Sequence, residues 1–204
     1  MIFDFLNTDD IRMEYCDESR RDIQRVLDTC REERRPYVVI KNHRSAQQSC
    51  SLDIQNSSVL SSILVPITML EEEVYKAEIC TYLARKTSAH LILLRANDYG
   101  SKALHNTQRI ITHIQNISER TGTPISYEER VAKGDSFHIH KELPTYFSTL
   151  KQGERERCLI LLTASREYGL DDWLFGPPEQ YVIRKSLVPV MLINPRADLF
   201  SLCD

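Results

Sequence analysis

The chain has 204 residues, of which 42% are hydrophobic and 27% charged, enough for one soluble domain with a full core, or for one domain plus a partial one. The formal net charge of −3 gives no electrostatic basis for binding nucleic acid or an anionic membrane, and no apolar run approaches the roughly 20 residues of a membrane span. The first ten residues are acidic where a signal peptide would be basic, so we expect a cytoplasmic protein.

Residues 1–41 predict a short strand–helix–strand extension. The first strand is IFDFL at residues 2–6, a polar helix runs from Ser19 to about Arg34, and a second strand covers Pro36–Ile40. One such unit cannot bury both faces of its strands, so we expect it to pack on a larger domain or on another chain. Residues 42–62 carry seven serines and no sustained apolar period, which indicates a linker.

Residues 63–195 predict an α/β domain with a parallel sheet, followed by a C-terminal tail at 196–204. Four of its strands are near-continuous apolar runs separated by helices, which is typical of buried parallel strands. A third strand in chain order alternates polar and apolar residues, as an edge strand does. The five predicted strands are SSILVPI from Ser61, AHLILLRA from Ala89, ISYEERV from Ile125, RCLILLTA from Arg157 and SLVPVMLI from Ser186.

The helices between these strands have recognisable start and stop signals. Thr68 and Glu71 have the spacing of a capping box, and a second helix over about Lys102–Arg120 is ended by Gly122. A third helix is expected over residues 139–150, where Pro144 should kink it or divide it into two short pieces. The prolines at 177 and 178 fit the first turn of the last helix.

The cysteines indicate a reducing compartment. None of the six lies within a C-x-x-C spacing, so the pattern favours neither a zinc knuckle nor a redox pair. Cys80 and Cys158 stand in apolar patterns, and we expect both to be small core residues.

The opening ILVPIT at Ile63–Thr68, the turn Lys133-Gly134-Asp135 and the closing VPVMLI at Val188–Ile193 resemble the universal stress protein family. The similarity covers about Ser61–Pro195, and the segment from Gly176 to Val190 aligns with the family's last helix and strand without gaps. It implies a five-stranded parallel sheet of doubly wound type. The N-terminal extension looks like the fourth strand, helix and fifth strand of a preceding copy, since tandem members are common in that family.

The same resemblance implies that ATP is not a cofactor. Nucleotide-binding members carry G-x2-G-x9-G-[ST] after the fourth strand, and here these positions are Thr163, Arg166, Gly176 and Pro177. The family's adenine-contacting aspartate falls on Thr68, and proline has no N–H to offer a phosphate. Any ligand should lie where open α/β sheets form their crevice, between the ends of the first and fourth strands of the domain. The residues of this degenerate site are Pro66, Ile67, Thr68, Thr163, Arg166, Gly176 and Pro177.

A homodimer is the predicted assembly, because the family often pairs its last strands and an apolar strand at a sheet edge invites another strand. The predicted interface residues are Val188, Val190, Met191, Leu192 and Ile193. In the competing arrangement, the N-terminal strand Tyr37–Lys41 covers this edge within one chain and imitates the dimer.

For the other candidate metal, acidic or phosphate-binding residues, we favour ordinary surface or packing roles. His138 and His140 lie two residues apart, which on a helix does not suit one metal ion, so we expect surface histidines and no metal site. Asp171, Asp172 and Trp173 read as a loop with the tryptophan packed on the sheet, and Arg166 as a solvated loop residue. No catalytic triad, Walker loop or G-x-G-x-x-G motif can be assembled, and we predict no catalytic residues.

These observations favour a non-enzymatic, universal stress protein-like regulator that acts through contacts with an unidentified protein partner. The alternatives are a nucleotide-binding module for ATP or AMP, with Thr68, Arg166 and Gly176 rebuilding the pocket, and a cytosolic regulatory domain of a membrane antiporter.

Limited proteolysis tests the predicted domain boundary. Because the serine-rich segment 42–62 offers little to bury, we expect the first cut there, read by mass spectrometry of early fragments. A first cut inside residues 63–193 would place the boundary elsewhere.

Overall fold

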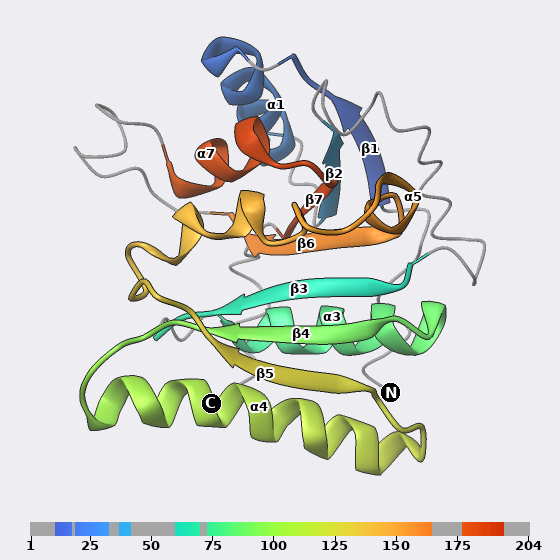
Figure 1. Ribbon diagram of the computed structural model, residues 1–204, viewed down its shortest axis with the longest axis vertical. Coiled ribbons are helices and arrows are strands. Elements are labelled where there is room, and N and C mark those ends of the chain that lie inside the picture. Colours follow the sequence, from blue (N-terminus) through green and yellow to red (C-terminus); the bar gives the residue numbers. More distant parts are fainter. Residues whose placement is uncertain are drawn as a thin grey trace.

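The computed structural model describes residues 11–17, 19–32, 37–41, 60–69, 73–164 and 177–193. These residues form one seven-stranded sheet with the strand order β1-β2-β7-β6-β3-β4-β5 (Figure 1). The strands are β1 (Ile11–Tyr15), β2 (Tyr37–Lys41), β3 (Ser62–Ile67), β4 (His90–Arg95), β5 (Tyr127–Val131), β6 (Cys158–Thr163) and β7 (Val190–Ile193).

The helices lie on both faces of this sheet. The α-helices are α1 (Arg20–Glu32), α3 (Glu73–Thr87), α4 (Ser101–Thr121), α5 (Gln152–Arg155) and α7 (Pro178–Lys185), and the 3-10 helices are η3 (Ile139–Lys141) and η4 (Leu143–Thr145). One core cluster joins α3 and α4 to the sheet, and the other joins α1, α7 and the η3–η4 region to the opposite face. Successive strand residues enter opposite clusters, for example Ile63 and Val65 on one face and Leu64 on the other.

The predicted fold class is confirmed. Strands β3, β4, β5, β6 and β7 are parallel to one another, in the order β7-β6-β3-β4-β5, with helices covering both faces. Strand β5 is an edge strand, as its alternating sequence predicts. The sheet is larger than the five predicted strands, because β1 and β2 extend it.

The prediction that the last strand lies at a sheet edge is wrong. Strand β7 has β6 on one side and β2 on the other, with β2 antiparallel and Val38 opposite Leu192. The predicted interface residues Val188, Val190, Met191, Leu192 and Ile193 are all buried in the core of a single chain. The structure therefore has the competing arrangement, in which Tyr37–Lys41 covers this edge. The homodimer stays a prediction, but not one that β7 can form in the full chain.

The N-terminal unit β1–α1–β2 is a structural counterpart of β6–α7–β7. Each is a pair of parallel strands joined through a helix, and both helices lie over the same face of the sheet (Figure 1). At the carboxyl ends, Cys16 N–H donates to Lys41 O at 3.0 Å and Ala164 N–H donates to Ile193 O at 2.9 Å. Helices α1 and α7 contact each other, and Gln180 Nε2 donates to Gln24 Oε1 at 3.4 Å. The antiparallel β2–β7 contact thus joins two similar units.

Several local predictions are confirmed. Helix α4 ends before Gly122, whose φ of 61° is left-handed and whose N–H donates to Glu119 O. The region around Pro144 forms two short 3-10 pieces instead of one helix. Cys80 and Cys158 are buried, and desolvation raises the pKa of the Cys80 thiol to about 12, as expected for an inert core cysteine.

Other local predictions need correction or lie outside the described residues. The first strand among the described residues, Ile11–Tyr15, was not predicted. The predicted strand IFDFL, the capping residue Glu71 and most of the predicted linker lie outside the described residues. The short helix α5 was not predicted, because its four residues carry no apolar period. Within the described part of the chain, no helix has both the length and the apolar character needed to span a membrane.

Removing the N-terminal unit should expose the β7 edge. We expect a chain beginning at Ser61 to self-associate more strongly than the full chain, because the β7 backbone then lacks its antiparallel neighbour. Light scattering over a concentration series measures this, with circular dichroism as the check on folding. A folded, truncated chain that stays monomeric at high concentration would contradict the prediction.

Candidate functional site

The predicted crevice lies where the chain leaves neighbouring strands toward opposite faces of the sheet. Strand β3 leads into α3 on one face, and β6 leads toward α7 on the other, so the carboxyl ends of β3 and β6 form a topological switch point. The β3–β6 ladder joins residues 62–64 to residues 158–160, whereas β3 pairs with β4 as far as Ile67 and β6 pairs with β7 as far as Thr163. The two strands therefore separate toward their carboxyl ends.

On the β3 side of the switch point, a buried cation holds the end of the strand. Lys76 of α3 is 3% exposed, and its Nζ donates to Pro66 O at 2.8 Å. Ile67 and Thr68 are also buried. Pro66, Ile67 and Thr68 thus lie where the sequence predicted, but the carbonyl of Pro66 is already occupied by a side chain of the same protein.

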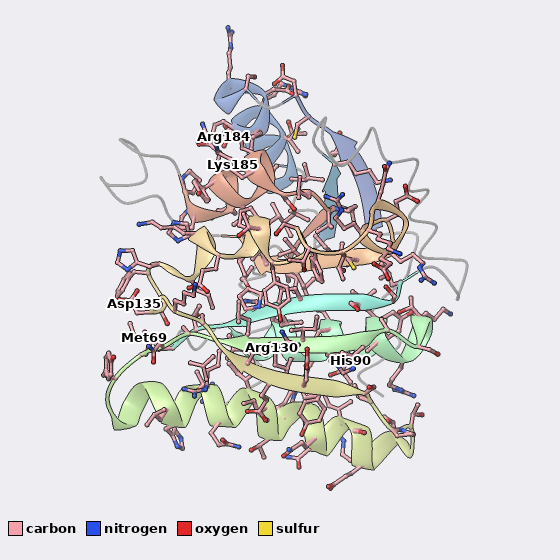
Figure 2. The ribbon with its side chains drawn as sticks, viewed as in Figure 1. Met69, His90, Arg130, Asp135, Arg184 and Lys185 are labelled. Atoms are coloured by element: carbon pink, nitrogen blue, oxygen red, sulfur yellow. The ribbon has the colours of Figure 1, made fainter. Side chains whose placement is uncertain are left out.

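A hydrogen-bonded cluster ties together the loops that follow β3, β4 and β5. Ser136 donates its N–H to Asp98 Oδ1 at 2.8 Å and its hydroxyl to Asp98 Oδ2, and the same hydroxyl accepts the N–H of Met69 at 2.9 Å. Asn97 N–H also donates to Gly134 O at 2.9 Å. We call Met69, Asp98 and Ser136 the loop latch. Figure 2 shows Met69 beside Asp135, the residue that precedes Ser136, at this end of the sheet.

The glycine–acid turn after β5 supports the latch. Gly134 N–H donates to Glu142 Oε1 at 2.6 Å, and Asp135 Oδ1 accepts the N–H of Phe137 and of His138, both at 3.0 Å. The His138 ring lies 2.7 Å from the same oxygen, and this hydrogen bond is the main cause of a lowered pKa at Asp135.

The two histidines near this turn have different surroundings. His138 is exposed beside Asp135, whereas His140 is half-buried with its ring edge-on to Tyr181, and burial lowers the pKa of His140. Within the described segments, no three metal-ligating side chains come together.

On the β6 side, the start of α7 offers little to an anion. Pro177 and Pro178 supply no N–H, and Gln180 donates its own N–H to Pro177 O at 3.0 Å. Glu179, in the same first turn, is a carboxylate with only 3% of its surface exposed. Phosphates bind helix N-termini through free N–H groups and the positive end of the dipole, so these residues oppose phosphate binding here.

The remaining predicted site residues are only partly described. Thr163, in place of the motif's first glycine, is half-buried, and its Oγ1 has no hydrogen-bond partner in the described structure. Arg166, Gly176 and the segment 171–173 lie outside the described residues. Sequence reasoning missed Lys76, Asp98 and Ser136. The available signal was a polar residue shortly after a buried strand, such as Asp98, three residues beyond the end of β4.

Substitution of Gly134 by alanine tests how closely the turn after β5 is packed. A Cβ at this position would lie 3.0 Å from the backbone C of His138, so Gly134→Ala should cost about 1–3 kcal/mol in the free energy of unfolding by urea. Gly153→Ala is the matched control, because nothing lies within 4 Å of the added Cβ and its helix favours alanine. Equal stability of the two variants would contradict the tight packing at Gly134.

Comparisons with known proteins bear on the fold. The sequence matches no protein-family model and no curated protein. Solved structures are similar: a universal stress protein in complex with cAMP has 17% identity over 68% of this chain and 100% of its own, with a TM-score of 0.50. A universal stress protein from Archaeoglobus fulgidus has 18% identity over 79% of this chain and 50% of its own, with a TM-score of 0.52.

A putative universal stress protein from Pseudomonas aeruginosa extends the similarity to the N-terminal unit. It has 14% identity over 94% of this chain and 65% of its own, with a TM-score of 0.50. This chain therefore spans all of one of these structures, half of another and about two thirds of the third. Sequence identities of 14% to 18% show a shared fold and nothing about activity. The architecture is that of the universal stress proteins.

Proposed function

We propose that this chain is a universal stress protein-like regulator that acts through contacts with other proteins, without ATP and without catalysis. The observation that supports this most directly is the first turn of α7. There, Pro177 and Pro178 have no N–H, and Gln180 N–H donates to Pro177 O, so the turn offers a phosphate few donors.

The hydrogen bonds among the loops that follow β3, β4 and β5 also support a regulator that acts through protein contacts. The loop latch uses its polar groups on one another, since Asp98 accepts twice from Ser136, whose hydroxyl also accepts from Met69. Such a closed set of hydrogen bonds makes a firm surface, with few of its donors left for a small polar ligand. Firm loops on a rigid sheet suit recognition of another macromolecule.

The second candidate is a nucleotide-binding module. The cAMP complex of one structural neighbour motivates it, and the buried ammonium group of Lys76 beside Pro66 supplies a positive charge at the switch point. Lys76 would have to exchange its contact with Pro66 O for a phosphate or a base. The two candidates therefore differ in a single measurable quantity, the affinity for nucleotides.

Titration calorimetry separates the two candidates. We expect the full chain to give no saturable heat with ATP and magnesium, or with cAMP, because two prolines leave the start of α7 with few N–H donors for a phosphate. Mass spectrometry of the purified protein is the parallel measurement, with no nucleotide expected. Low-micromolar affinity for either compound, or a co-purified nucleotide, would replace the proposal with the second candidate.

A further inference from the structure

Strand β5 is one of the two outer strands of the sheet, and no described strand lies on its outer side. In a parallel ladder, alternate residues of a strand direct both backbone groups toward one neighbour. Here Ser126 O accepts the N–H of Leu91, and Ala132 N–H donates to Arg95 O, so the even-numbered residues face β4. The backbone N–H and C=O groups of the odd-numbered residues of β5 therefore point outward.

The side chains of β5 are open to solvent along this edge. Glu129, Arg130 and Val131 are exposed, Val131 at 55%. Tyr127 and Glu128 are half-buried. An open edge strand pairs readily with another strand, and proteins commonly oppose this with charged side chains. The charges of β5 have both signs, so whether they oppose pairing depends on the sequence of the strand that they meet.

The sequence of β5 is complementary to itself when two copies run antiparallel. Outward backbone groups must meet outward groups, and a two-fold axis at Glu129 achieves this while pairing all five residues of the strand. Tyr127 then lies opposite Val131 of the second copy, and aromatic residues pair well with β-branched ones. Glu128 lies opposite Arg130 of the second copy, in the closer, non-hydrogen-bonded type of pair. The axis repeats each of these pairs.

The neighbouring registers lack this complementarity. An axis at Glu128 places that residue opposite its own copy, and an axis at Arg130 does the same for the arginine. Like charges directly opposite each other destabilise a sheet, and neither of these registers pairs opposite charges within β5. The register centred on Glu129 has one like-charge pair, at the axis, against two pairs of opposite charge. The charges of β5 thus select one register.

The charged side chains are already held on a common face of the strand. Arg130 Nη2 lies 2.8 Å from Glu128 Oε1, and the guanidinium group lies 5.9 Å from the ring centroid of Tyr146. In the antiparallel pair, the two glutamates and two arginines of this face would alternate in sign across the axis. Each arginine could then contact a carboxylate of either chain.

We propose that β5 binds β5 of a second copy of this chain, antiparallel and about a two-fold axis at Glu129. We call this assembly the β5 dimer. It joins two seven-stranded sheets edge to edge, whereas β7, the strand expected from the sequence to pair, already has β2 beside it. The inference goes beyond the proposed function and does not rest on it, because the β5 dimer needs no other protein and does not involve the crevice.

Light scattering of the full chain over a concentration series measures the dimer, with circular dichroism as the check on folding. Arg130→Glu should weaken dimerisation at least about tenfold, because both pairs of opposite charge become like-charge pairs. Glu128→Arg combined with Arg130→Glu should restore it, because the two charges are only exchanged. Arg157→Glu, at an exposed arginine directly before β6, makes the same change of charge and should leave dimerisation unaltered. Glu129→Gln should strengthen dimerisation, because it removes the like-charge pair at the axis.

Introduced cysteines test the register. Residues opposite each other in a hydrogen-bonded pair have Cα atoms about 5.5 Å apart, within reach of a disulfide. Glu129→Cys should therefore give disulfide-linked dimers on mild oxidation, read on a non-reducing gel against the original chain. Glu128→Cys is the control, because its two copies lie diagonally, about 7–8 Å apart, and should link far more slowly.

Three results would overturn the proposal. They are a full chain that stays monomeric at every concentration, a dimer that responds equally to Arg130→Glu and Arg157→Glu, and equal disulfide formation by the two cysteine variants. A folded double variant that stays as weak as Arg130→Glu would also contradict it. Should the Arg130→Glu chain not fold, the comparison of the cysteine variants decides alone.

Discussion

The antiparallel pairing of β2 with β7 is the contact on which the whole arrangement depends. Strand β7 is apolar and buried on both faces, so its backbone groups need partners on both sides. Strand β2 satisfies one side and at the same time brings α1 over the sheet, where Ile23, Val26 and Leu27 join the core cluster of α7 and η3. Backbone pairing and apolar burial reinforce each other here, because the pairing determines where α1 can pack.

The carboxyl end of the sheet is divided into two halves with different properties. At the β6–α7 half, Pro177 and Pro178 leave the first turn of α7 with few N–H groups. At the β4–β5 half, the loop latch turns three connections into one firm surface that presents aromatic side chains to solvent.

Much of the fold could be predicted from the sequence because it depends on local patterns. Continuous apolar runs predicted parallel strands, and Pro144 and Gly122 marked a broken helix and a helix end. Strand β1 was not predicted, because IRMEY at Ile11–Tyr15 has little apolar character and forms a strand through its pairing with β2. Pairing between distant segments cannot be read from local pattern, and for this reason β7 was placed at an edge.

The candidate site shows the same limit. The switch point followed from the predicted order of strands, and Pro66, Ile67 and Thr163 lie there. Asp98 and Ser136 are 38 residues apart in the chain, and nothing in either local sequence indicates that they meet. Their hydrogen bonds arise from the side-by-side placement of β4 and β5, which only the folded sheet provides.

Because β1–α1–β2 and β6–α7–β7 are similar units of one chain, the pairing of β2 with β7 does not depend on protein concentration. When two separate chains pair their last strands, the fraction paired falls on dilution. Here both strands belong to one molecule, so the partner is always present at the high effective concentration of a tethered segment. The paired state then forms in a first-order process and is the same at every expression level. A cell could lower the amount of this protein severalfold without changing the proportion of molecules in which β2 and β7 are paired.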